Sequence, residues 1–125
     1  MKEYRRGDIV YAYFNGKGSV QHGFRPCLII SNRQTNCSRS KILNVAPLTT
    51  KEKNIPVHVL IKPEDVSGYL EKTSYCMLEQ TVPIDKQFVT EKMGHIKESS
   101  EVMDKVDLAI IKQFEIKKEN VNHGV

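Results

Sequence analysis

The stretch GSVQHGFRPCLIISN (residues 18–32) decides how the chain begins to fold, because a polar, glycine-containing loop runs directly into a short apolar segment. Residues 26–31 form an apolar run of the length expected for a strand buried on both faces. Pro26 suits the first position of such a strand, where a missing backbone donor does least harm. Arg25 immediately precedes this strand, so its side chain is predicted to stand at the mouth of a buried element.

Strand-like segments lie on both sides of this run. Residues 8–14 are β-branched and aromatic, and the Asn and Gly residues at 15–18 tolerate the backbone of a tight turn, so a strand followed by a turn and a loop to Gly23 is predicted. Residues 32–40 are polar and predict a loop, and a helical turn is expected after Pro63. Further strands are predicted at 41–49, 55–61 and 74–80, with a short one near the end of 88–96.

The period of the apolar residues changes after residue 98. Val102, Val106, Ala109, Ile110 and Phe114 recur at helical spacing, with Ser99 or Ser100 available as the helix cap. The tail 117–125 has no apolar pattern and is expected to be frayed.

These elements predict a fold that is mainly β with α. A chain of 125 residues suggests one domain, here 1–116. Five or more short strands and one amphipathic helix suggest a small, strongly bent antiparallel barrel or open sheet, with the helix laid against it. So small a barrel has little interior, and its chemistry is expected in loops at the strand ends.

The composition narrows the class of protein. The net charge of +4 and pI near 9.0 are compatible with a polyanionic partner. No apolar run approaches the roughly 20 residues of a membrane helix, and no signal peptide is visible, so we expect a cytoplasmic protein. The three cysteines have neither zinc-site nor disulfide spacing, and Cys27 and Cys76 are predicted to be small core residues.

Familiar catalytic signatures are missing from the sequence. It contains no GxxxxGK[ST], GxGxxG, HExxH or GxSxG motif. Its histidines lie far apart without ligand-like spacing, so no metal or cofactor is expected. His58 falls in an alternating strand and is predicted to be half-exposed.

The remaining candidates for catalysis or binding are polar residues at the ends of predicted strands: Arg25, Thr49, Thr50, Glu79 and Gln80. Taken singly, each has an ordinary structural explanation, as a solvated loop residue or a strand terminus. Taken together, an arginine, a hydroxyl and a carboxylate at neighbouring strand ends could hold a phosphodiester, since a guanidinium matches two phosphate oxygens at once.

The segments RRGDIVYAYF, GFRPCLIISN, NVAPLTT, IPVHVLI and MLEQTVPIDKQFVTEKMGHI, in this order, resemble the MazF/PemK family of toxin endoribonucleases. The similarity runs from about Arg6 to the C-terminal helix. It implies a compact SH3-like barrel with added helices, shared with plasmid toxins that poison gyrase. It also implies a metal-independent homodimer that cuts single-stranded messenger RNA and leaves 2′,3′-cyclic phosphate and 5′-hydroxyl ends.

The resemblance also implies roles for particular residues. The family's catalytic arginine falls on Arg25 and its catalytic threonine on Thr49. Glu79 stands where the plasmid branch has an aspartate proposed as a base. Met77 replaces that branch's arginine, so this chain is closer to the chromosomal branch. His22 is an alternative acid–base group.

RNA recognition is expected from stacking and from hydrogen bonds to base edges. The resemblance and the residue types together suggest these contacts: Ser19, Gln21, Phe24, Thr50 and Gln80, with Asn36 and Arg39 as further candidates. The expected protein partner is a cognate antitoxin whose acidic, partly disordered segment covers the basic RNA groove.

Two other functions remain open from the sequence. One is a gyrase poison on the same barrel, although the ending IKKENVNHGV lacks the Trp-Gly-Ile terminus of such poisons. The other is a small RNA-binding barrel without catalysis.

Overall fold

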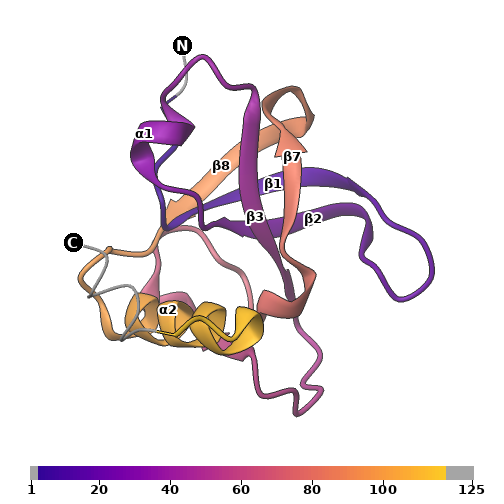
Figure 1. Cartoon of the computed structure of the whole chain (residues 1–125), viewed down its shortest axis with the longest axis vertical. Coiled ribbons are helices and arrows are strands. Elements are labelled where there is room, and N and C mark those ends of the chain that lie inside the picture. The colour runs from indigo at the N-terminus through magenta and orange to yellow at the C-terminus, as the bar shows by residue number, and fades with distance from the viewer. Residues whose placement is uncertain (1–2, 118–125) are drawn as a thin grey trace.

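The computed structural model describes residues 3–117, which form one bent sheet with a helix packed across it (Figure 1). The strands are β1 (Asp8–Asn15), β2 (His22–Ile29), β3 (Ile42–Thr49), β4 (His58–Ile61), β5 (Ser67–Gly68), β6 (Ser74–Met77), β7 (Val82–Asp85) and β8 (Val89–His95). The helices are α1 (Arg33–Asn36), α2 (Glu101–Phe114) and three single 3-10 turns, η1 (Pro63–Asp65), η2 (Leu78–Gln80) and η3 (Lys86–Phe88). The expected frayed tail lies, apart from Lys117, outside the described residues.

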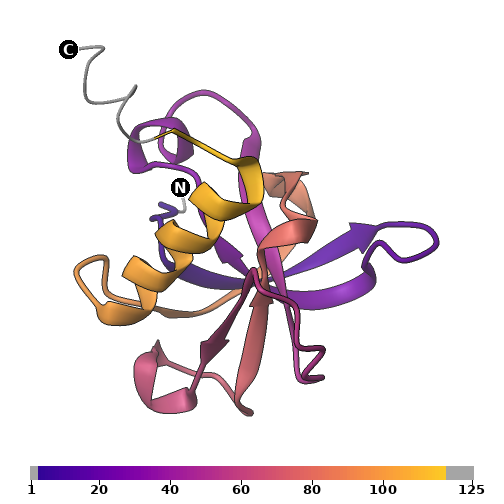
Figure 2. The ribbon, with the colours of Figure 1, turned by 60° about the horizontal axis from the view of Figure 1, so that its bottom comes forward.

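All strand pairs are antiparallel, and the strand order is β4-β6-β3-β2-β1-β8-β5, with β7 paired to β3 beside this path. The path does not close on itself, so the fold is an open, barrel-like sheet. β3 joins the two halves of the sheet, one containing β2 and the other containing β6. Val45–Pro47 pair with β2, whereas Leu48 and Thr49 pair with β6. The β1–β2 hairpin projects from the side of the molecule (Figures 1 and 2).

Apolar side chains form two cores, one on each face of the sheet. The first core lies under α2, whose Met103, Val106 and Ala109 are buried against the sheet (Figure 2). The second core lies between β1, β2, β3 and β7 and includes Val10, Cys27 and other alternating strand residues. Since side chains alternate between faces along a strand, each central strand serves both cores.

The C-terminal helix confirms the sequence prediction. Ser100 caps α2, and its hydroxyl accepts a hydrogen bond from Met103 N at 3.3 Å. Acidic residues Glu101 and Asp104 lie in the first turn, where their negative charges interact favourably with the positive end of the helix dipole. Phe114 belongs to the predicted apolar face, but 56% of it is exposed.

The RGD sequence at residues 6–8 connects the segment before β1 to β8 and α2 through side-chain contacts. Arg6 donates to Ile30 O at 3.1 Å and pairs with Glu98 at 2.8 Å and with Asp107. Gly7 has φ +98°, and a Cβ there would collide with the Ile96 carbonyl oxygen, so glycine is required.

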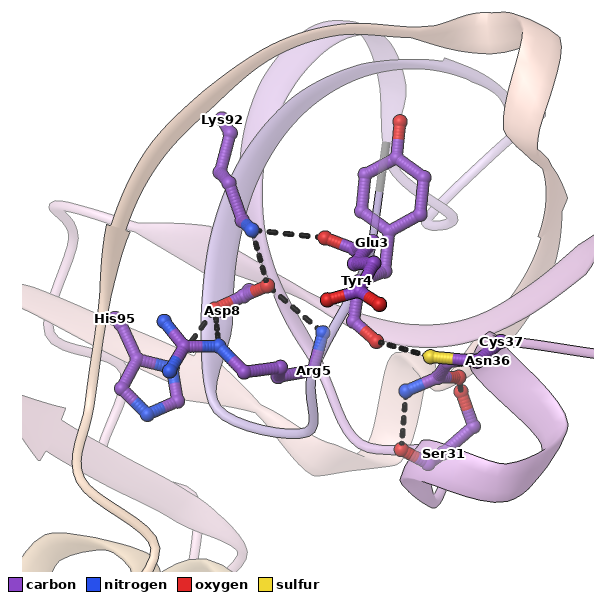
Figure 3. A network of polar contacts seen from close by, with 9 residues as sticks. All are labelled: Glu3, Tyr4, Arg5, Asp8, Ser31, Asn36, Cys37, Lys92 and His95. Atoms are coloured by element: carbon purple, nitrogen blue, oxygen red, sulfur yellow. Dashed lines mark hydrogen bonds and ion pairs between the residues drawn. The ribbon is translucent and has the colours of Figure 1, made fainter. Parts of the chain in front are cut away.

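Asp8 is fully buried and is held by a cluster formed by Arg5, Lys92 and His95 (Figure 3). Its carboxylate accepts from Arg5 N at 2.8 Å, and it pairs with His95 Nδ1 at 2.7 Å and Lys92 Nζ at 3.2 Å. Arg5 Nε approaches to 3.6 Å. A buried charge is tolerated only when paired in this way, so the cluster ties β1 to β8 and to the segment before β1.

Several boundaries differ from the sequence predictions. β2 begins at His22 rather than at Pro26, because Asn15↔His22 pairing extends the hairpin to the turn. The 32–40 loop contains the short helix α1, capped by Asn32. The strand predicted at 55–61 begins only at His58, the one predicted at 74–80 ends at Met77 in the η2 turn, and β5 and β7 were not predicted.

Candidate functional site

Arg25 and Thr49 belong to the neighbouring strands β2 and β3, and each lies two residues beyond the last pair of their ladder. The ladder between these strands ends at Cys27↔Pro47. Continuing its register by two residues sets Arg25 opposite Thr49, and directly opposed residues share a face of the sheet. The sequence-predicted arginine and threonine therefore lie on one face, immediately beyond the second core.

Thr49 stands at the junction between the two halves of the sheet. It is the last residue of β3, it is only 8% exposed, and it pairs with Tyr75 of β6. Its Oγ1 accepts a hydrogen bond from Lys51 N at 3.2 Å. This bond occupies a lone pair and leaves the hydroxyl proton for an outside acceptor.

Arg25 is half-buried in the middle of β2. Its Nε donates to His22 O at 3.4 Å, which turns the side chain toward the start of the strand. An arginine guanidinium carries a fork of further donors that suits a phosphate or carboxylate.

Ser19, Gln21 and Gln80, which the sequence analysis grouped as RNA contacts, are brought together by hydrogen bonds. Gln80 Oε1 accepts from Gln21 N at 2.9 Å, and Gln80 Nε2 donates to Ser19 O at 3.2 Å. The carboxamide of Gln80 thus fixes the β1–β2 loop against the η2 turn. Gln21 and Gln80 also line a cavity of about 470 Å³ together with Tyr13 and Phe88.

Phe24 and Thr50 lie apart from this group. Since Phe24 neighbours Arg25 in β2, its side chain points to the opposite face. Its exposed ring stacks on Tyr11 with centroids 6.0 Å apart and meets Tyr13 edge-on at 5.1 Å. Thr50 is exposed and lines a second cavity, of about 430 Å³, with Tyr11.

Glu79 pairs with a residue that the sequence analysis dismissed. Glu79 Oε2 lies 2.9 Å from His58 Nε2. His58 as a residue is half-buried, as predicted, but its side chain is only 4% exposed. β4 pairs with β6 so that His58 lies opposite Met77, two residues before Glu79. Glu79 Oε1 and His58 Nδ1 are buried and lack hydrogen-bond partners within residues 3–117.

The remaining candidates have separate environments. Asn36 is 1% exposed and its Nδ2 donates to Ser31 O at 2.8 Å, so the structure contradicts the expectation that Asn36 faces an RNA base. Arg39 is exposed in the loop before β3. His22 is exposed at the start of β2, and its ring meets Tyr13 at 6.0 Å.

The Cys27 and Cys76 thiols are structural, and the potential metal-ligating side chains are dispersed within the described residues. Cys27 and Cys76 are fully buried, as predicted, and burial raises the pKa of both thiols. Among residues 3–117, no three His, Cys, Asp or Glu side chains gather in a way that would hold a metal ion. No helix in that range has the length and apolarity to cross a membrane.

Comparisons with known proteins agree on one family. A family model described as the PemK-like, MazF-like toxin of type II toxin–antitoxin systems matches residues 5–114. Endoribonuclease EndoA of Bacillus subtilis is 38% identical over 109 residues, covering 85% of this chain and 90% of that protein. Endoribonuclease MazF of Staphylococcus saprophyticus is 34% identical over 111 residues, with the same coverage.

Solved structures of similar proteins share the fold. MazF from Deinococcus radiodurans matches with a TM-score of 0.76 and 18% identity, covering 93% of this chain and 100% of that chain. A mycobacterial endoribonuclease, solved in complex with its cognate antitoxin, matches with a TM-score of 0.71 and 20% identity, covering 94% and 98%.

Proposed function

The chain belongs to the PemK-like, MazF-like toxins of type II toxin–antitoxin systems, and from that premise we propose that it is an endoribonuclease that cuts single-stranded messenger RNA with Arg25 and Thr49. The single observation that carries the residue assignment is the β2–β3 register, which leads from Cys27↔Pro47 to Arg25 and Thr49 on one face. The gyrase-poison and binding-only alternatives are not favoured, because both curated relatives are named endoribonucleases.

The proposed reaction uses the RNA's own nucleophile. The 2′-hydroxyl oxygen attacks the adjacent phosphorus while the bond from phosphorus to the 5′-oxygen breaks. One proton leaves the 2′-hydroxyl and another is delivered to the departing 5′-oxygen, which gives a 2′,3′-cyclic phosphate and a 5′-hydroxyl. The step needs no metal ion if fixed donors stabilise the charge on the phosphoryl oxygens.

Arg25 and Thr49 supply those donors in this proposal. The guanidinium binds the phosphoryl oxygens through two parallel hydrogen bonds, and the Thr49 hydroxyl gives a third. Arg25 also delivers the proton to the leaving oxygen. Support for Thr49 comes from the Lys51 N bond to its Oγ1, because that bond restrains the hydroxyl rotor.

Glu79 is the proposed proton acceptor for the 2′-hydroxyl. His58 holds Oε2, and Oε1 is left without a partner within residues 3–117. The contact with His58 orients the carboxylate, as a general base requires, and the proposal demands that the bound RNA reach the buried Oε1.

Glu79→Gln keeps the size of the side chain and removes its basicity. We expect the cleavage rate to fall by about 100-fold, the lower range for loss of a general base. The rate should be measured at saturating RNA over a range of pH, since the low-pH limb of the profile should disappear with the base. A Glu79→Gln rate equal to that of the wild type would remove Glu79 from the reaction.

The RNA is proposed to bind along the β1–β2 loop. Ser19, Gln21 and Gln80, which hydrogen bonds hold together, are proposed to contact base edges there. Phe24 and Thr50 lie apart from this group, so any RNA contact they make would be separate from it. The protein is further proposed to act as a cytoplasmic homodimer that a cognate antitoxin inhibits. Structural neighbours solved in antitoxin complexes support binding of such a partner.

The activity is tested by incubating the purified protein with RNA in EDTA. We expect cleavage at a short recurring sequence, with 2′,3′-cyclic phosphate and 5′-hydroxyl ends found when the fragments are sequenced. Single-stranded DNA of the same sequence is the control, and it should stay intact because it lacks the 2′-hydroxyl. Intact RNA, or cleavage only after magnesium is added, would contradict the proposal.

A further inference from the structure

Tyr75 is the direct neighbour of Thr49 across the seam between β3 and β6. These two residues oppose one another in the ladder, and Tyr75 opposes Leu60 of β4 on its other side. Opposed residues lie with their Cβ atoms about 5 Å apart on the same face of a sheet. The Tyr75 ring therefore rises from the face that carries Thr49 and Arg25.

The exposure of Tyr75 sets it apart from its strand. Ser74, Cys76 and Met77 are buried, whereas Tyr75 is half-exposed, and the adjoining Leu60 is 40% exposed. The row of side chains one step inward, formed by Cys27, Pro47 and Met77, is buried. On this face, solvent is excluded from the row of Cys27, Pro47 and Met77 but reaches the side chain of Tyr75.

A carboxylate lies near the phenol of Tyr75. Partial desolvation raises the pKa of the Tyr75 phenol, and the nearby Glu52 carboxylate raises it further. The phenol therefore stays neutral at physiological pH. Glu52 belongs to the exposed loop after β3.

The charges on either side of Thr49 differ in sign. Arg25 in β2 attracts a phosphate, whereas Glu52 beside Tyr75 repels one. A bound RNA strand is thereby oriented with its phosphate toward β2 and a neighbouring base toward β6. A neutral aromatic ring at that place offers stacking, which every nucleobase accepts.

We propose that Tyr75 is a specificity-determining residue that stacks on the nucleobase flanking the phosphate held by Arg25 and Thr49. The inference rests on the proposed function, because it takes that pair as the cleavage centre. If Tyr75 were only structural, it would shield Leu60 from solvent. Replacing it would then leave RNA binding unchanged, whereas loss of a stacking residue would weaken RNA binding.

Binding can be tested without cleavage. The sequence contains no tryptophan, so Y75W introduces a single indole reporter at this place. Single-stranded poly(dA), poly(dC) and poly(dT) lack the 2′-hydroxyl and serve as uncut probes. We expect saturable quenching of the Y75W fluorescence by at least one of them. The control is F114W, at the exposed end of α2, which should not respond.

Kinetics give the second measurement. Tyr75→Leu should raise the KM for RNA on the order of tenfold, the loss expected for one stacked base, with kcat little changed. Tyr75→Phe keeps the ring and should restore the wild-type KM, and the thermal melting temperatures of both variants should match the wild type. Sequenced fragments should show relaxed base preference beside the cut for Tyr75→Leu alone.

The outcomes separate the two ideas. If the wild type cuts no RNA, the cleavage proposal fails, and quenching of Y75W then reports only a binding site. If the wild type cuts RNA, two results overturn the role of Tyr75. One is an unquenched Y75W, and the other is a Tyr75→Leu variant with unchanged KM and cleavage sequence.

Discussion

Arg25→Ala is expected to lower the rate of RNA cleavage by about 100- to 1000-fold, the loss typical of one fixed donor that binds developing charge. The fold should persist, because Arg25 is half-buried and its Nε makes one long contact, to His22 O. Single-turnover cleavage with excess protein measures the chemical step directly. The loss should appear in kcat rather than in KM, which distinguishes it from the effect of Tyr75.

Two further variants sharpen this test. Arg25→Lys keeps the charge but loses the planar fork, so it should recover only part of the rate. Arg33→Ala removes an exposed arginine of α1 and should leave cleavage unchanged. Wild-type activity in Arg25→Ala, or an equal loss in Arg33→Ala, would show that general positive charge rather than Arg25 supports the reaction.

Asp8→Ala is expected to destabilise the protein by about 3 kcal/mol, a large part of the 5–15 kcal/mol that stabilises a typical domain. The substitution leaves Arg5 N without its acceptor and removes the partner of His95 and Lys92. These two side chains are partly exposed and regain water, which keeps the loss at the lower end for a broken buried pair. Urea unfolding followed by circular dichroism measures the change.

Asp8→Asn is the matched comparison. It preserves the shape of the side chain and one acceptor but loses the charge, so its stability should fall between the wild type and Asp8→Ala. Glu91→Gln changes an exposed carboxylate on the same strand, β8, and should shift the urea midpoint little. An unchanged midpoint in Asp8→Ala would mean that the cluster around Asp8 contributes nothing net to folding.

Local patterns predicted the elements whose signals lie within the element itself. The β-branched and aromatic residues of β1, the apolar run within β2 and the helical spacing of α2 all lie in elements of the predicted type, although β2 spans His22–Ile29 rather than 26–31. β7 was missed because Pro83 looks like a break in a strand. It pairs only with β3, and a strand with one free edge tolerates a residue that lacks a backbone donor.

The site was predictable where a family pattern exists and unpredictable where it depends on pairing between distant segments. Nothing near His58 in the sequence indicates that β4 will lie beside β6 and bury it against Glu79. Tyr75 likewise gains its meaning only from its pairing with Thr49. Asp8 resembles a solvated residue at a strand start, because its partner His95 is 87 positions away.

The double pairing of β3 also limits how this protein can change its length. Only one residue, Leu48, lies between Pro47, the last partner of β2, and Thr49, the partner of Tyr75. A single insertion or deletion there would turn the threonine to the other side of the sheet. The lengths of the loops at residues 16–21 and 50–57 are not fixed by pairing on two sides. New RNA preferences can therefore arise in these loops while the spacing between Pro47 and Thr49 stays the same.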